Sequence, residues 1–282
     1  MLIADNLTYE IAKRALVKDI SFSIRPGELM AILGSNGAGK STLLRMLSGE
    51  KKATKGSLKL HGREIADYTL ADLALKRGVL NQQNVVNMAF TVLEIVTMGR
   101  YPHYKNRPKL NDSNIVHQVM ELTGITAFAE RAYLTLSGGE QQRTQLARVL
   151  AQIWDVPAAV LLMDEPVASL DLQYQQQTLA IAKTLSKRGF MVITVLHDIN
   201  LAAQYADRIL MLKNGRKWYD GTAAEVLTSK NIYEVFEINS DVYTNPRTLQ
   251  HFFIPRNVSI NIKFEKSATS PLSLSYDQQI QL

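Results

Sequence analysis

A glycine-rich run near residue 34 has the residue types and spacing that bind phosphate groups. Residues 34–41 read Gly-Ser-Asn-Gly-Ala-Gly-Lys-Ser and match the pattern G-x-x-x-x-G-K-[ST]. Glycines let the backbone turn tightly and point several N–H groups at phosphate oxygens, and a helix starting near Lys40 adds the positive end of its dipole. Lys40 can then reach the β- and γ-phosphates, while the Ser41 hydroxyl can ligate Mg²⁺. The predicted ATP-binding residues here are Gly34, Ser35, Asn36, Gly37, Ala38, Gly39, Lys40, Ser41 and Thr42.

Two adjacent carboxylates follow an apolar run later in the chain. Asp164 and Glu165 come directly after Leu161–Met163. Ligands of open α/β sheets bind at the carboxyl ends of the strands, so we expect both carboxylates beside the phosphate loop. Asp164 is predicted to hold Mg²⁺ through water, and Glu165 to polarise the attacking water as general base. A plain strand-to-loop exit is the alternative.

A third run, residues 136–143, reads Leu-Ser-Gly-Gly-Glu-Gln-Gln-Arg and opens a helical segment. Ser137 and Glu140 have the spacing of a capping box, which would satisfy free N–H groups at a helix start. A helix start does not explain Gly138 and Gly139, because successive glycines weaken a helix unless a ligand must approach the backbone closely. Both interpretations, a well-made helix start and a ligand contact, are open at this point.

Composition limits what these runs can belong to. The 282 residues are 46% hydrophobic and 21% charged, which is typical of a soluble globular protein of one large domain or a domain with a subdomain. The absence of cysteine excludes disulfides and thiolate metal sites. The net charge of +6 has no dense basic block, which favours an ordinary solvated surface over nucleic-acid binding. No apolar stretch is long enough to span a bilayer and no signal-peptide pattern opens the chain, so action at a membrane requires a partner that spans it.

The spacing of apolar residues predicts strands that alternate with helices. Strands are expected at 3–9, 17–24, 29–33, 57–60, 77–80, 158–163, 191–196 and 209–212, and helices at 40–47, 92–98, 115–122 and 141–150. Residues 158–163 and 191–196 are continuously apolar, as in parallel strands covered on both faces, so we predict a three-layer α/β core. Residues 100–112 are expected to form an exposed loop, 214–215 a hairpin turn and 267–282 a loosely held tail.

Taken in order, these runs resemble the motifs of ABC transporter ATPases. Residues 136–143 resemble the signature motif of that family and lie between the phosphate loop and the acidic pair, as the family requires. The resemblance covers roughly residues 1–230. It implies an α/β P-loop NTPase cassette with a three-layer core, an N-terminal antiparallel β-subdomain and an inserted α-helical subdomain. The implied ATPase domain is 1–240, with the RecA-like core and β-subdomain in 1–86 and 154–240, the helical subdomain in 87–153, and a C-terminal extension in 241–282 whose end is poorly ordered.

The resemblance also assigns roles to single residues. Tyr9 resembles the aromatic residue that stacks on adenine, with an ordinary strand tyrosine as the alternative. Gln82 resembles the glutamine that contacts Mg²⁺ and the attacking water, although the adjacent Gln83 leaves the register open by one residue. Ser169 and Asp171 resemble the loop that crosses between monomers, and Asp171 has helix capping as its alternative.

The mechanism implied by the resemblance needs two copies of the chain. They are expected to close head to tail around two ATP molecules, each bound between the phosphate loop of one copy and the signature segment of the other. His197 resembles the switch histidine at the γ-phosphate. The implied catalytic residues are Glu165, His197, Lys40 and Gln82, the Mg²⁺ ligands are Ser41, Gln82 and Asp164, and the signature residues are Ser137, Gly138, Gly139 and Glu140.

The implied partners are a second copy of this chain, two copies of a transmembrane permease subunit and, indirectly, a substrate-binding protein, with no nucleic acid. The implied location is the cytoplasmic face of the inner cell membrane, as a peripheral subunit. Residues 91–103 resemble importers of iron–siderophore complexes, cobalamin and haem, and residues 80–83, 147–154 and 196–205 resemble hemin importers most, although Asn81 departs from the proline expected there.

Three alternatives to a hemin importer remain. A ferric-siderophore or cobalamin importer is one, because the substrate never contacts this subunit. A non-transport ABC ATPase is another, but such proteins usually have coiled-coil insertions or tandem cassettes. A nucleotide-dependent binding module without turnover is the third, and Glu165 and His197 argue against it.

Overall fold

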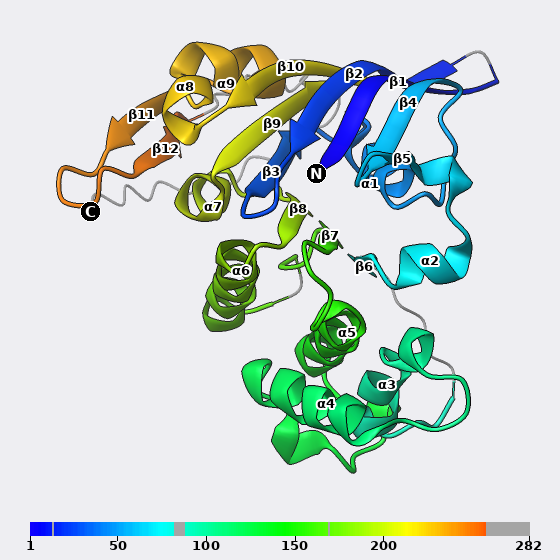
Figure 1. Cartoon of the computed structure of the whole chain (residues 1–282). Coiled ribbons are helices and arrows are strands. Elements are labelled where there is room, and N and C mark those ends of the chain that lie inside the picture. Colours follow the sequence, from blue (N-terminus) through cyan, green and yellow to red (C-terminus); the bar gives the residue numbers. More distant parts are fainter. Residues whose placement is uncertain (13, 82–87, 169, 258–282) are drawn as a thin grey trace, which may run out of the picture.

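The computed structural model describes residues 1–12, 14–81, 88–168 and 170–257. Figure 1 shows a central sheet, an antiparallel sheet to one side of it and a group of helices on the other. Among the described helices, none is both long enough and apolar enough to cross a bilayer.

The central sheet has six strands in the order β10-β9-β3-β8-β7-β6. Its members are β3 (Leu29–Gly34), β6 (Arg77–Leu80), β7 (Val160–Asp164), β8 (Met191–Val195), β9 (Arg208–Lys213) and β10 (Arg216–Gly221). All neighbours pair in parallel except β9 and β10, which form a hairpin. Parallel pairing brings the ends of β3 and β7 to the same edge, with only β8 between them.

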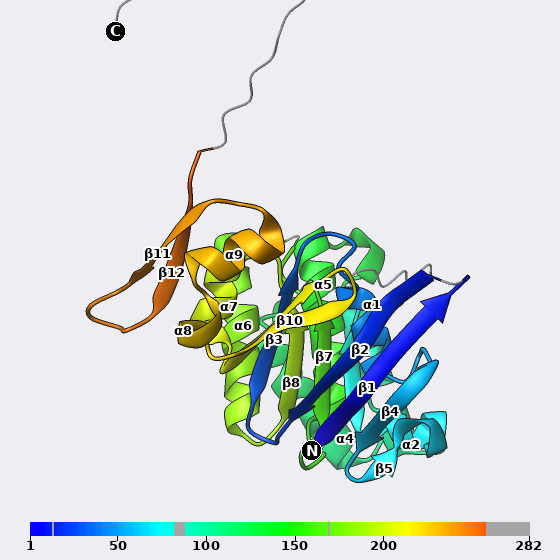
Figure 2. The same cartoon turned by 90° about the horizontal axis from the view of Figure 1, so that it is seen from above.

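The antiparallel sheet has the order β2-β1-β4-β5, from β1 (Leu2–Ile11), β2 (Arg14–Ile24), β4 (Lys55–Leu60) and β5 (Arg63–Glu64). Helix α1 (Lys40–Leu47) packs between this sheet and the central one. Its Leu43 and Leu47 share a buried cluster with Leu7 from β1 and with Ile32 from β3. The helix that follows the phosphate loop is therefore held on two sides, as Figure 2 also shows.

Helices cover the other face of the central sheet. Helices α3 (Val92–Met98), α4 (Leu110–Leu122) and α5 (Gly138–Ile153) share one apolar cluster with β7, β8 and α6 (Leu172–Lys187). A second cluster joins β3 and β9 to α7 (Ile199–Tyr205), α8 (Ala223–Val226) and α9 (Ser229–Phe236). The remaining short elements are α2 (Leu70–Ala74) and 3-10 turns at Ile65–Asp67, Tyr101–His103, Thr126–Phe128 and Tyr133–Thr135.

The predicted fold class is confirmed, and most predicted elements appear where the sequence placed them. The helix at 40–47, the strand at 77–80 and the helix at 92–98 have the predicted bounds. One hairpin was not predicted: β11 (Ser240–Thr244) pairs with β12 (His251–Pro255) and packs Val242 and Phe253 against the α7 cluster. The predicted tail at 267–282 lies outside the described residues.

The prediction that residues 100–112 form an exposed loop is wrong at both ends. Arg100 is 2% exposed and Asp112 is 4% exposed. The Arg100 guanidinium donates from Nε to Asp112 at 2.9 Å, and from Nη1 to the Ala151 carbonyl and the Asp155 carboxylate, both at 2.8 Å. Burial alone raises the pKa of Asp112, but the Lys109 amide and Arg100 outweigh it and hold that pKa below its usual value. The charges that suggested exposure instead satisfy one another inside the helical group.

Replacing Arg100 with alanine should lower the free energy of unfolding by about 3–5 kcal/mol, because it leaves the buried Asp112 carboxylate uncompensated. The loss should be present at neutral pH and shrink as the pH falls toward the range in which Asp112 becomes protonated. Lys59→Ala, which breaks an ion pair with Glu64 whose partners are 47% and 35% exposed, serves as the control at ~0–1 kcal/mol. Urea unfolding of both variants measures the difference, and equal losses would contradict a buried ionic hub at Arg100.

Candidate active site

The phosphate loop lies at the carboxyl end of β3 and is packed tightly against neighbouring backbone. A Cβ atom at Gly34 would lie 2.4 Å from the Leu212 carbonyl oxygen, and one at Gly39 would lie 2.5 Å from that of Leu16. Gly39 also has a φ of 99°, in the left-handed region that favours glycine. Close approach on both sides therefore requires glycine at the first and last glycine positions of the loop.

Lys40 opens helix α1 and is buried. Its ammonium donates to the carbonyl oxygens of Gly34 at 2.9 Å and Ser35 at 3.1 Å, which places the charge inside the loop. Burial lowers the pKa of Lys40, while the negative charges of Glu165 and Asp164 act in the opposite direction. The predicted juxtaposition of Lys40 with the acidic pair is therefore present.

Ser41 and Asp164 bring two oxygen ligands together across the sheet edge. The Ser41 hydroxyl donates to Asp164 Oδ1 at 3.2 Å, although the residues are far apart in the chain. Burial raises the pKa of Asp164 despite this hydrogen bond, and the charge of Glu165 adds to the rise. A buried carboxylate beside a hydroxyl fits Mg²⁺, which prefers oxygen ligands and takes the rest from water and phosphate. No cluster of three or more His, Cys, Asp or Glu side chains competes as a metal site within the described residues.

Glu165 and His197 meet at the ends of β7 and β8. Glu165 Oε1 lies 2.6 Å from His197 Nε2, and the Glu165 amide donates to the Val195 carbonyl. Glu165 has a φ of 51°, a left-handed conformation that is unfavourable for a residue with a Cβ and is typical of functional sites. Both side chains, together with Gln175, line a cavity of about 260 Å³. The pair thus lies at the same sheet edge as Asp164, and the charge of Glu165 acts on Lys40.

Tyr9 lies on strand β1 and contacts Lys51 and the buried cluster around α1. Its ring packs against the buried cluster around α1, its hydroxyl accepts from Lys51 Nζ at 3.2 Å, and that ammonium lies 5.0 Å from the ring centroid. Tyr9 on β1 pairs with Val17 on β2, and the neighbouring Leu16 carbonyl approaches Gly39. Tyr9 therefore pairs with the strand that contacts the phosphate loop. Adenine stacking on Tyr9 remains a prediction.

The signature segment begins helix α5 with the predicted capping box. The Ser137 amide donates to Glu140 Oε2 at 2.7 Å, and the Glu140 amide donates to Ser137 Oγ at 3.3 Å. The hydrogen bond from the Ser137 amide lowers the pKa of Glu140. A Cβ at Gly138 would meet no described atom within 4 Å, and one at Gly139 only Leu170 at 3.5 Å. Packing within the described part of this chain therefore does not account for the two glycines.

The remaining predicted residues are placed as follows. Asp171 caps α6 by accepting from the Tyr174 amide at 3.0 Å, which is the capping alternative weighed from the sequence. Gln82, Gln83 and Ser169 lie outside the described residues. Two backbone neighbours of the phosphate loop were missed: Leu16 and Gly215. The Asn214–Gly215 dipeptide predicts a turn, but its contact with Ala38 could not be predicted because the two segments are far apart in the sequence.

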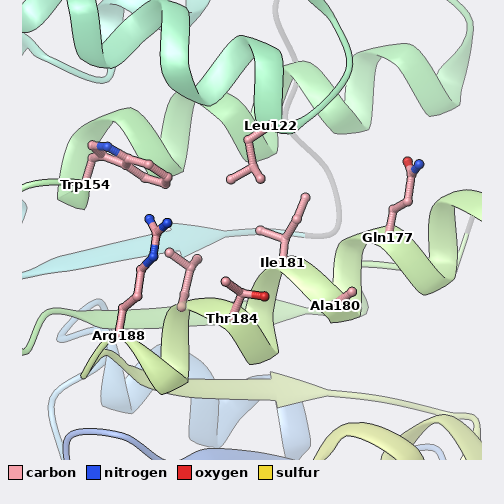
Figure 3. A pocket seen from close by; sticks show the side chains of 8 residues that line it. Leu122, Trp154, Gln177, Ala180, Ile181, Thr184 and Arg188 are labelled. Atoms are coloured by element: carbon pink, nitrogen blue, oxygen red, sulfur yellow. The ribbon is translucent and has the colours of Figure 1, made fainter.

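A second cavity, of about 300 Å³, lies between the ends of α4 and α5 and one face of α6 (Figure 3). Trp154 and Leu122 face Ile181 and Arg188 across it, and the Arg188 guanidinium lies 5.5 Å from the Trp154 ring. Its lining is mainly apolar and shares no residue with the phosphate loop or the acidic pair. We assign it no part in the chemistry of the site.

Known proteins with the same motifs and fold are numerous. The family described as "ABC transporter" matches residues 17–168. A hemin import ATP-binding protein HmuV from Gloeobacter violaceus is 46% identical over 88% of this chain and 91% of its own, and one from Methylobacillus flagellatus is 42% identical over 84% and 89%. The chain belongs to the ABC transporter family of ATP-binding proteins.

Solved structures agree with this membership. An ABC transporter described as metal-chelate type, in an inward-facing conformation, has a TM-score of 0.76 at 26% identity, covering 91% of this chain and 97% of that one. A dimeric bacterial ABC transporter cassette has a TM-score of 0.70 at 28% identity, covering 79% and 98%. This ABC protein is thus an ATPase that binds ATP and hydrolyses it.

Asp164→Asn should stabilise the nucleotide-free ABC protein at neutral pH. Because the pKa of Asp164 is raised in the native state, a charged Asp164 lowers the free energy of unfolding at any pH above that raised pKa. This destabilisation disappears as the pH falls toward 3.8, the usual pKa of the group. Removing the charge while keeping an acceptor for Ser41 should raise the Tm at pH 7, at roughly 2–4 °C per kcal/mol in domains somewhat smaller than this one. The gain should vanish near pH 4.

The same variant should lose most of the Tm rise that Mg-ATP gives the wild type, since a cation ligand is gone. Calorimetry with and without Mg-ATP measures both effects, and the exposed Asp5→Asn is the control. A lower Tm for nucleotide-free Asp164→Asn at pH 7 would refute the charge penalty.

Proposed function

We propose that this protein powers import through a membrane permease by binding Mg-ATP at the phosphate loop and hydrolysing it. The observation that carries the proposal is the meeting, at one sheet edge, of Ser41 with Asp164 and of Glu165 with His197, beside the buried Lys40. Phosphate, cation and attacking water each find suitable groups within this one site. Such positioning and electrostatic stabilisation are what phosphoryl transfer requires of a protein.

Each residue has a definite task in this proposal. The Lys40 ammonium exchanges the Gly34 and Ser35 carbonyls for phosphate oxygens. Ser41 and Asp164 hold Mg²⁺, which, when bound, neutralises charge on the phosphates. Glu165 accepts a proton from the attacking water, and His197, already bonded to Glu165, orients that carboxylate and faces the γ-phosphate. Gln82 as a further Mg²⁺ ligand belongs to the same proposal.

The open glycines of the signature segment support a homodimer. Gly138 has no described neighbour that excludes a side chain, and Ser137 beside it is exposed, yet this helix start uses glycine. A phosphate chain bound to a second copy would approach that backbone closely and explain the choice. We therefore assign each ATP to the phosphate loop of one copy and the Ser137–Glu140 segment of the other, with Ser169 and Asp171 crossing between them.

The proposed substrate is hemin, with a ferric-siderophore or cobalamin as the alternative. Support comes from relatives that are named hemin import ATP-binding proteins and that align over most of their own length. We place the protein on the cytoplasmic side of the membrane against two permease subunits served by a substrate-binding protein. The ATPase domain is proposed to be 1–240, with 87–153 as its helical subdomain and 241–282 as an extension.

Glu165→Gln should leave ATP binding near wild-type level and lower the hydrolysis rate at least about 100-fold, because the proposed general base is lost. ATP should then trap the variant as a closed dimer. Steady-state phosphate release and size-exclusion chromatography with and without Mg-ATP measure the two effects. Glu121→Gln, an exposed position on α4, is the control and should hydrolyse ATP normally. Wild-type turnover by Glu165→Gln would refute the assignment.

Complementation tests the substrate. In a bacterium that needs hemin as its iron source and lacks its own hemin import ATPase, this chain expressed with its permease should restore growth, while Lys40→Ala should not. Parallel cultures supplied only with a ferric siderophore or depending on cobalamin uptake give the alternatives. Growth restored in one of those cultures and not on hemin would exclude hemin as the substrate.

A further inference from the structure

The end of β9 and the turn that follows it lie against the two ends of the phosphate loop, although the two segments are far apart in the sequence. At the first end, Gly34 pairs with Leu212 and leaves no room for a Cβ beside its carbonyl. At the other end, the Gly215 amide donates to the Ala38 carbonyl at 3.1 Å. A Cβ at Gly39 would lie 3.5 Å from the Gly215 Cα. The end of β9 thus contacts one end of the loop, and Gly215 in the turn contacts the other.

Strand β2 closes this junction from outside. The Lys18 amide donates to the Gly215 carbonyl at 2.7 Å, so both backbone groups of Gly215 are occupied, one by the phosphate loop and one by β2. The Leu16 carbonyl approaches Gly39 and Gly215 alike. Both views of the fold show β2 beside β10, in agreement with these bonds (Figures 1 and 2). Three backbone segments therefore meet at one point of the loop.

The turn is tight and is anchored to a second element away from the site. Asn214 and Gly215 have φ values of 51° and 75° and connect the paired residues Lys213 and Arg216, which defines a tight two-residue hairpin turn. Lys213 donates to the Glu234 carbonyl at 2.6 Å and pairs with Glu237 at 3.0 Å, which fixes the turn to the end of α9. A loop that presents amides to phosphate needs such a fixed support, since a small displacement misaligns the donors.

We propose that Gly215 is a positioning residue for the phosphate loop, which holds the Ala38–Lys40 segment in the geometry that binds the β- and γ-phosphates. This inference rests on the proposed function of that loop. Gly215 acts through the Ala38 carbonyl, to which its amide donates. Any side chain at 215 would meet the Leu16 carbonyl oxygen at 2.8 Å and push the turn from the loop.

The chain contains a matched control for this test. His61 and Gly62 form a second two-residue turn, between β4 and β5, with φ values of 51° and 82°. A Cβ at Gly62 would meet no described atom within 4 Å. Gly62→Ala therefore carries the same left-handed backbone strain as Gly215→Ala without the steric displacement and without contact with the phosphate loop.

Gly215→Ala should weaken Mg-ATP binding by about 10-fold or more, whereas Gly62→Ala should change it by no more than about 2-fold. Titration with a fluorescent ATP analogue gives the affinities. Pyrophosphate, used as a competitor, should lose affinity in parallel, because the defect is in phosphate binding. Equal affinities of the two variants, or a loss for ATP with unchanged pyrophosphate competition, would overturn the positioning role.

A milder pair of variants covers the case in which Gly215→Ala does not fold. Asn214→Ala and His61→Ala change the first residue of each turn, and only the former should weaken pyrophosphate and Mg-ATP binding. Wild-type protein that fails to bind Mg-ATP would refute the proposed function itself. Wild-type protein that binds, with Asn214→Ala indistinguishable from His61→Ala, would refute only the inference about the turn.

Discussion

The chemistry of this protein depends on one electrostatic constraint: a buried ammonium is held beside two carboxylates at the edge of a sheet. Burial disfavours the charge on Lys40 and on Asp164, as the opposite directions of their pKa shifts show. The fold maintains this arrangement because α1, which begins at Lys40, is packed between two sheets. A bound triphosphate would place negative charge beside Lys40, and Mg²⁺ would place positive charge beside Asp164. Binding would therefore offset the electrostatic penalty that burial imposes on these two side chains.

Glycines show, by what surrounds them, which parts of the site are complete in a single chain. Backbone carbonyl oxygens of this same chain leave no room for a side chain at Gly34 or Gly39, so the phosphate loop is shaped by its own fold. Gly138 and Gly139 have almost no such neighbours. A glycine whose necessity is not explained by the described packing of its own chain is a reason to look for a partner, and the solved dimeric cassette has the same fold.

Sequence patterns predicted the elements that chemistry and hydrophobic periodicity define locally. The strand 77–80 and the helix 40–47 follow from apolar spacing alone, and residues 34–41 follow from their glycines and lysine. Three features were inaccessible for physical reasons. The Arg100 hub consists of charges that become internal only when three helices meet, and the packing of Tyr9 depends on Lys51 from another element. Gly215 reaches Ala38 only because β9 pairs with β3 in the sheet.

The two segments of the proposed ATP site, the phosphate loop and the signature segment, are attached to the rest of the fold in different ways. The phosphate loop is bonded into the central sheet, whereas the signature segment is the first turn of α5, whose 16 residues extend roughly 24 Å. The far end of α5 is fixed twice: Arg100 binds the Ala151 carbonyl, and Gln152 donates to the Ala74 and Arg77 carbonyls at 2.7 and 2.9 Å.

Helix α5 therefore connects the Arg100 hub directly to the signature segment, with Ala151 and Gln152 at one end and Ser137 at the other. The start of β6, at Arg77, is held by the same helix through Gln152. A partner that pressed on residues near 100 would therefore act on the distant end of α5 without contacting nucleotide.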